Sequence, residues 1–115
     1  MPAELMKAMI ITGITGVSVG SRPLTQVELA VPEPGEGEIL IRVAACGVCH
    51  TELDEIEGRT PPPRFPVIPG HQVVGHVVKC GPNASGFQPG ERVGVGWIYS
   101  ACGTCDSCRN GNENL

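Results

Sequence analysis

The pattern of apolar and polar positions predicts short β-strands separated by turns. Apolar runs bounded by glycine or proline cover residues 8–12, 24–30, 38–45, 72–79 and 91–95. The clearest strand is the third run, because Ile39, Ile41 and Val43 alternate onto one face. The fourth run is apolar enough to be a central strand, covered on both faces.

One segment favours a helix. Thr51 and Asp54 form a weak helix-start sequence, and Gly58 is a typical stop, which predicts a helix over residues 51–57. The proline-rich residues 60–66 are predicted to be an extended loop. Many strands with one short helix indicate a mainly β fold, either a small barrel or a sandwich.

The length and net charge of the chain argue against several classes of partner. A chain of 115 residues is one domain or part of one. Its net charge is −4 and it has no basic run, so we expect no nucleic-acid partner. No run approaches the roughly 18 apolar residues of a membrane helix, and no signal-peptide pattern is visible. We therefore expect a cytoplasmic protein with reduced thiols and no membrane partner.

The thiols carry the most specific pattern. Six cysteines are present: Cys46, Cys49, Cys80, Cys102, Cys105 and Cys108. The last three have the spacing Cys-x₂-Cys-x₂-Cys, which lets their sulfurs converge on one metal ion. We interpret them as three of the four ligands of a structural zinc, with free thiols as the alternative. An iron–sulfur loop is disfavoured, because no Cys-Pro follows at the required short gap.

A second cluster combines thiol and imidazole groups. Cys46 and Cys49 are followed by His50, and His71 comes directly after Gly70. A thiolate and an imidazole suit a catalytic zinc, which takes three protein ligands and keeps one position open. A redox pair is the alternative for Cys46 and Cys49. We expect Cys46 and Cys80 to be small buried side chains.

Four motifs in order resemble the zinc-dependent alcohol dehydrogenases of the medium-chain dehydrogenase family. They are Ala-Cys-Gly-Val-Cys-His-Thr at 45–51, Pro-Gly-His-x-Val-Val-Gly at 69–75, Pro-Gly-Glu-Arg-Val-Gly-Val-x-Trp at 89–97, and the terminal cysteine loop. The resemblance implies a GroES-like, partly open β-barrel with one or two short helices. Residues 1–115 would be an incomplete N-terminal domain. We find no Rossmann fingerprint, because the pair Gly94 and Gly96 lacks a third glycine.

The resemblance also implies roles. Cys49 and His71 match two ligands of the catalytic zinc, whose third ligand would lie downstream. Thr51 matches the hydroxyl that takes part in the proton relay, and His50 matches a position that contacts the cofactor phosphates. Trp97 matches a wall of the substrate pocket. The three late thiols match structural zinc ligands, whose fourth member would directly follow Leu115: Cys102, Cys105 and Cys108.

Three positions depart from the family pattern. Glu52 stands where an aspartate usually supports the ligand histidine. Gln72 replaces a glutamate, and Asp54 replaces a histidine that ends the proton relay in many members. The alternative for the acidic residues from Glu52 to Glu57 is a solvated helix face.

These features predict the N-terminal part of an enzyme that oxidises an alcohol to an aldehyde or ketone with zinc and NAD or NADP. The 115-residue chain alone is expected to be inactive. Expected partners are a small alcohol or aldehyde and a second copy of the chain, which would associate through exposed sheet edges. The alternative is a free-standing, non-enzymatic GroES-like zinc-binding module.

Overall fold

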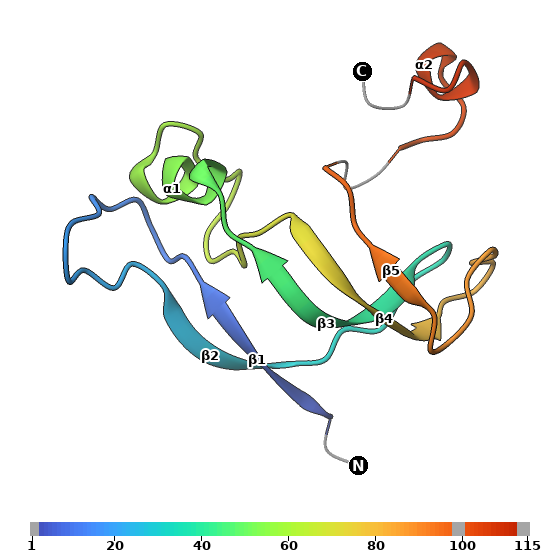
Figure 1. Ribbon diagram of the computed structural model, residues 1–115, viewed down its shortest axis with the longest axis horizontal. Helices are drawn as coiled ribbons and strands as arrows, with labels where there is room; N and C mark the ends of the chain where they lie inside the picture. Colours follow the sequence, from blue (N-terminus) through green and yellow to red (C-terminus); the bar gives the residue numbers. More distant parts are fainter. Residues whose placement is uncertain (1–2, 98–100, 113–115) are drawn as a thin grey trace.

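The molecule is built on two antiparallel sheets that long loops connect (Figure 1). The computed structural model describes residues 3–97 and 101–112. The first sheet pairs β1 (Leu5–Ile10) with β2 (Thr25–Ala30). The second contains β3 (Ile39–Gly47), β4 (Gln72–Cys80) and β5 (Arg92–Gly94). The helices are α1 (His50–Glu57) and α2 (Asp106–Arg109). This mainly β architecture confirms the predicted fold class.

The local sequence signals agree with the observed elements. Every predicted strand overlaps one of the five strands, and the predicted central strand is β4, which lies between β3 and β5. Helix α1 begins one residue before the predicted start. It ends at Glu57 and is followed by the cap residue Gly58, whose φ of 87° is the left-handed conformation that glycine adopts without steric cost.

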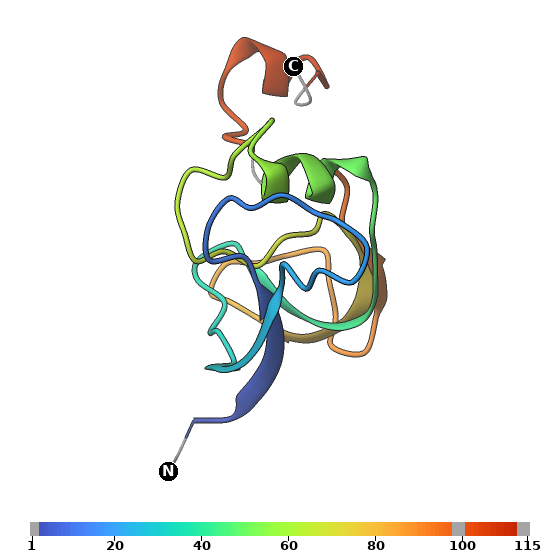
Figure 2. The same cartoon turned by 90° about the vertical axis from the view of Figure 1, so that its left-hand side faces the viewer.

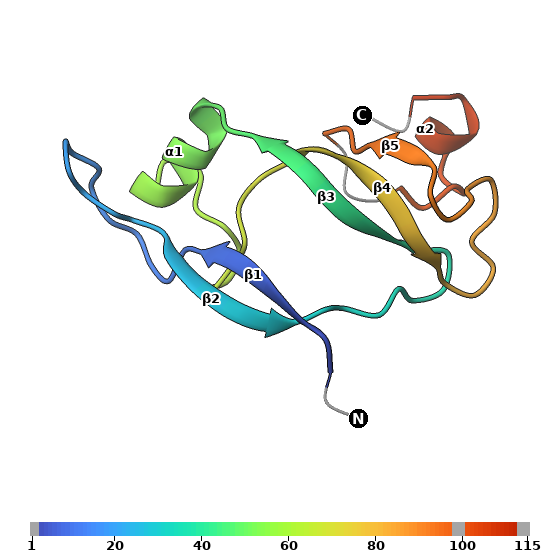
Figure 3. The same ribbon diagram turned by 60° about the horizontal axis from the view of Figure 1, so that its bottom comes forward.

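The pairing of β3 with β4 positions the candidate site. Gly47, the last residue of β3, pairs with Gln72, the first residue of β4. Cys49 follows Gly47 by two residues, and His71 immediately precedes Gln72. The register therefore brings these two side chains to the same end of the sheet. Figures 2 and 3 show α1 at that end, beside the loop that joins β1 to β2.

Contacts at the end of α1 attach that loop. The backbone N–H of Thr15 donates to the oxygen of Ile56 at 2.9 Å, and the N–H of Val17 donates to Glu57 Oε2 at 3.1 Å. Ile11 forms an isolated bridge with Val67 and is fully buried. The loop thus contacts both the helix and Val67, which directly follows the proline-rich segment, next to the candidate site.

The buried core of the described residues is small. Four apolar residues are buried: Ala8, Ile11, Ile56 and Val77. The expectation that Cys46 and Cys80 are buried is wrong, because Cys46 is exposed and Cys80 is only half-buried. Both lie in sheet strands that pack against no described helix along their length, so their side chains are not enclosed between packed elements.

Most strand edges are open. Within residues 3–97 and 101–112, β4 is the one strand with a partner strand on each side. Between β1 and β3 lies a groove of about 550 Å³, lined partly by the exposed side chains of Leu5, Val43 and Val78. Among the described helices, none is long and apolar enough to cross a membrane.

Candidate metal centres

A thiol, an imidazole and a carboxylate converge where β3, α1 and β4 meet. Cys49 precedes α1 as its N-cap residue, and its Sγ lies 3.6 Å from Nε2 of His71. The other ring nitrogen, Nδ1, lies 3.3 Å from Oε1 of Glu52. The three residues form one of two clusters with metal-ligating atoms in the described part of the chain.

Glu52 is buried, which the solvated-helix alternative does not explain. The residue is only 6% exposed, and its Oε2 accepts a 2.7 Å hydrogen bond from the backbone N–H of Cys49. Burial opposes its ionisation, but the N–H donors of Cys49 and of its own backbone, with His71 nearby, hold the pKa of Glu52 below its usual value. The carboxylate is therefore charged at neutral pH.

The donor geometry fits a zinc ion. Typical zinc–sulfur and zinc–nitrogen bonds with a tetrahedral angle place the two ligand atoms about 3.6 Å apart, and the observed Sγ–Nε2 distance is 3.6 Å. Glu52 Oε1 is buried without a hydrogen-bond partner of good geometry. A metal at Nε2 would fix the proton of His71 on Nδ1, where it faces that oxygen.

Gly70 and Gln72 flank His71 and restrict its surroundings. Gly70 has a φ of 121°, and a Cβ there would lie 2.8 Å from Cys46 Sγ, so a larger residue would displace the chain beside His71. The side-chain oxygen of Gln72 lies over Gly47, only 2.6 Å from the position of a Cβ at that glycine. Gln72 therefore packs on β3, and Glu52 supplies the carboxylate nearest to the imidazole.

A cavity of about 530 Å³ opens beside this cluster. It is lined by Thr51 and Asp54 of α1, by residues of the proline-rich segment, and by His71 and Trp97. The Trp97 ring stands edge-on to the His71 ring, with centroids 4.6 Å apart and an angle of 77°. Trp97 is 70% exposed, so it forms a wall of the cavity and does not belong to the core.

His50 does not belong to the cluster. Its side chain is 74% exposed, and its Nδ1 lies 3.1 Å from Asp54 Oδ1. Arg59 also donates to Asp54, and its second nitrogen lies 2.8 Å from Glu57 Oε1. The hydrogen bond from Arg59 is the main reason that the pKa of Asp54 lies below its ordinary value. Sequence reasoning missed Arg59, which carries no motif signal.

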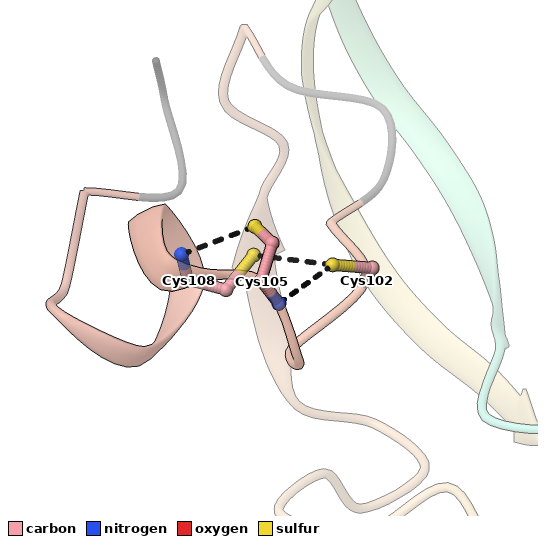
Figure 4. Close-up of side chains that lie close together, drawn as sticks. All are labelled: Cys102, Cys105 and Cys108. Atoms are coloured by element: carbon pink, nitrogen blue, oxygen red, sulfur yellow. Dashed lines mark hydrogen bonds between the residues drawn. The ribbon is translucent and has the colours of Figure 1, made fainter.

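The three late cysteines form the second cluster (Figure 4). Cys102 Sγ and Cys108 Sγ lie 3.8 Å apart, about the separation of two thiolates on a tetrahedral zinc. Cys102 Sγ accepts backbone N–H groups from Thr104 at 3.4 Å and Cys105 at 3.3 Å. Side-chain and backbone interactions with Thr104, followed by those with Cys105, lower the pKa of Cys102 to about 6. The three sulfurs therefore lie close enough together to share one metal ion.

The sequence predictions of site residues thus divide into three groups. Cys49 and His71 lie together, with Thr51 and Trp97 on the adjacent cavity. The second group is the three late thiols, which lie together in the loop around α2. The third group is His50 alone, which lies at the start of α1 and contacts the side chain of Asp54.

Comparisons with known proteins give a consistent assignment. Residues 35–115 match the alcohol dehydrogenase GroES-like domain. An alcohol dehydrogenase from Geobacillus stearothermophilus is 46% identical over 95 residues, which are 82% of this chain and 28% of that protein. A thermostable alcohol dehydrogenase from Pyrobaculum aerophilum, solved with cobalt and zinc, superposes with a TM-score of 0.83 at 30% identity, over 97% of this chain and 32% of that one. A solved NAD-dependent alcohol dehydrogenase superposes with a TM-score of 0.80 at 32% identity, over 96% of this chain and 31% of that one. The chain spans less than a third of each of these proteins.

Proposed function

The chain belongs to the family of the alcohol dehydrogenase GroES-like domain, and from this premise we propose that it forms the alcohol-binding part of a zinc-dependent alcohol dehydrogenase. The single observation that carries the proposal is the 3.6 Å approach of Cys49 Sγ to His71 Nε2 at the edge of a cavity. A nicotinamide cofactor and the remaining machinery would come from the rest of a longer protein.

Cys49 and His71 would hold the zinc, with Glu52 behind His71. The carboxylate of Glu52 orients the imidazole through Nδ1 and makes it a stronger donor at Nε2. Its hydrogen bond to the N–H of Cys49 also fixes the start of α1, from which the thiol projects. When bound, zinc supplies Lewis acidity that favours loss of the hydroxyl proton from an alcohol.

Thr51 and Trp97 would bind and orient the substrate. Thr51 lies on the cavity wall one turn or less from Cys49, and its hydroxyl oxygen would accept the alcohol proton while its own proton passes to water. The Trp97 ring offers an apolar surface to the carbon chain of the alcohol and excludes water from one side of His71. The cavity therefore suits a small alcohol or aldehyde with an apolar chain.

His50 and the late cysteines would serve the longer protein. His50 is exposed at the start of α1, where a cofactor phosphate could approach it. We assign Cys102, Cys105 and Cys108 to a structural zinc, because their sulfurs have the required spacing. Hydride transfer needs a nicotinamide bound next to the cavity, so we expect the 115-residue chain alone to be inactive. The open strand edges would favour self-association of the isolated chain.

Cobalt substitution tests this proposal on the chain itself. We would replace the three late cysteines by serine, load one Co²⁺, and titrate with trifluoroethanol while recording the visible spectrum. The proposal expects a spectral change that saturates, and weaker binding in Trp97→Ala. When the zinc-loaded chain is mixed with ethanol and NAD⁺ or NADP⁺, we expect no reduction of the nucleotide and therefore no increase in absorbance at 340 nm. A cobalt spectrum that does not change when the alcohol is added would refute the proposed site. Reduction of the nucleotide would refute the expected inactivity of the isolated chain.

A further inference from the structure

The three-cysteine loop holds two sulfurs in a position to react with each other. Cys102 Sγ lies 3.8 Å from Cys108 Sγ, and the Cα atoms are joined by a short loop and the first turn of α2. A disulfide has a sulfur–sulfur bond of about 2.05 Å. Cys102 is exposed and Cys108 is half-buried, so rotation of the Cys102 side chain about its Cα–Cβ bond can bring the two sulfurs closer together.

The environments of the three sulfurs differ. Cys102 Sγ belongs to an exposed residue that an oxidant can reach, and it accepts two backbone N–H groups. Cys105 Sγ instead accepts the N–H of Cys108 at 3.5 Å and caps α2. The geometry therefore makes Cys102 the first sulfur to react and Cys108 the partner that resolves it.

We propose that this loop is a peroxide-sensitive thiol pair in which a Cys102–Cys108 disulfide and a bound metal exclude each other. The Cys102 thiolate attacks one oxygen of hydrogen peroxide, the O–O bond breaks, and Cys102 becomes a sulfenic acid. Cys108 Sγ then attacks that sulfur and displaces water. In total, two thiols and one peroxide give one disulfide and two waters.

The competition with metal follows from the same atoms. A thiolate that donates to zinc has its lone pair engaged, and a disulfide sulfur is a poor zinc ligand. Oxidation would therefore prevent the loop from binding metal, and metal would protect it from peroxide. This inference does not depend on the alcohol chemistry, because Cys49 and His71 lie in the other cluster.

Peptide mapping of the full 115-residue chain tests the pairing. The metal-free chain is treated with one equivalent of hydrogen peroxide at pH 7, alkylated, and cleaved on the N-terminal side of aspartate. Cleavage before Asp106 separates Cys102 and Cys105 from Cys108. We expect a 2 Da loss and a disulfide that links these two peptides. The link should persist in Cys105→Ser and in the control Cys80→Ser, and disappear in Cys102→Ser and Cys108→Ser.

Two results would overturn the proposal. One is an absent link in the unsubstituted chain; the other is a link that disappears in Cys105→Ser, which would identify a different pair. Zinc gives a second readout: one equivalent of Zn²⁺ bound to the loop should slow disulfide formation at least tenfold. The zinc experiment is repeated in Cys49→Ser, so that the Cys49, Glu52 and His71 cluster does not compete with the loop for zinc. Equal rates with and without zinc would disprove the mutual exclusion.

Discussion

Replacement of Glu52 by glutamine tests how the chain prepares His71 for a metal. Glutamine keeps the size of the side chain, and its amide oxygen can still accept the hydrogen bond from the N–H of Cys49, now 2.7 Å long. The amide NH₂ would then face His71 Nδ1, which lies 3.3 Å from the present carboxylate oxygen. Two donors would oppose each other, so the imidazole proton moves to Nε2, the nitrogen that must be free to bind zinc.

The expected loss of zinc affinity is about 10–100-fold, the usual effect of removing a carboxylate behind a ligand histidine. This corresponds to about 1.4–2.8 kcal/mol of binding free energy. The assay is competition for zinc with a chromophoric chelator, in a chain whose three late cysteines are replaced by serine. Glu55→Gln, on the same helix, is the matched control and should change the affinity less than threefold. Unchanged affinity in Glu52→Gln, or equal losses in both variants, would refute the reasoning.

Three further outcomes are expected. Gly75→Ala should destabilise the fold by about 1–3 kcal/mol in urea unfolding, because its Cβ would lie 2.2 Å from a backbone oxygen of β3; Gly94→Ala, with its nearest such contact at 3.8 Å, should cost far less. In the metal-free chain, alkylation of Cys102 by iodoacetamide should rise with pH around a midpoint of about 6; a midpoint above 8 would contradict the hydrogen-bonding explanation. Asp54 has a lowered pKa, chiefly through Arg59, so its stabilising effect is present above its ordinary pKa and is lost as pH falls through the lower folded value. Asp54→Asn should therefore be less stable than the unsubstituted chain at pH 7, and the difference should shrink as the pH falls below the ordinary aspartate pKa; a difference that does not shrink would show another cause.

The strands and α1 could be predicted because their signals are local. Alternation at Ile39, Ile41 and Val43, together with the stop at Gly58, depends only on neighbours in sequence. The pairing of Gly47 with Gln72 could not be obtained in this way, because register is decided by which faces become buried and by bulges within β3. The residue types and their spacing indicate a metal site of thiol and imidazole groups, whereas the choice of Cys49 and His71 as the ligand pair comes from the family resemblance.

Two features of the site depend on tertiary contacts that local patterns do not show. Glu52 belongs to an acidic stretch that is typical of a solvated helix face, yet it is buried behind His71, at the position where the family resemblance implies a carboxylate that supports the histidine. Arg59 follows the helix stop and carries no pattern, but the turn at Gly58 brings it to Asp54. The prediction that Cys46 is buried failed for a different reason. Cysteine is often buried, but a side chain on a strand becomes buried only where another element packs over that strand.

The most direct test of the central claim is cobalt spectroscopy of the chain in which Cys102, Cys105 and Cys108 are replaced by serine. If Cys49 and His71 hold one metal ion, this variant binds one Co²⁺ with a thiolate-to-cobalt charge-transfer band in the near ultraviolet. Cys49→Ser in the same background should abolish the band, and His71→Ala should weaken binding at least tenfold. Absence of the band in the triple-serine variant, or an unchanged band after the further substitution Cys49→Ser, would contradict the claim.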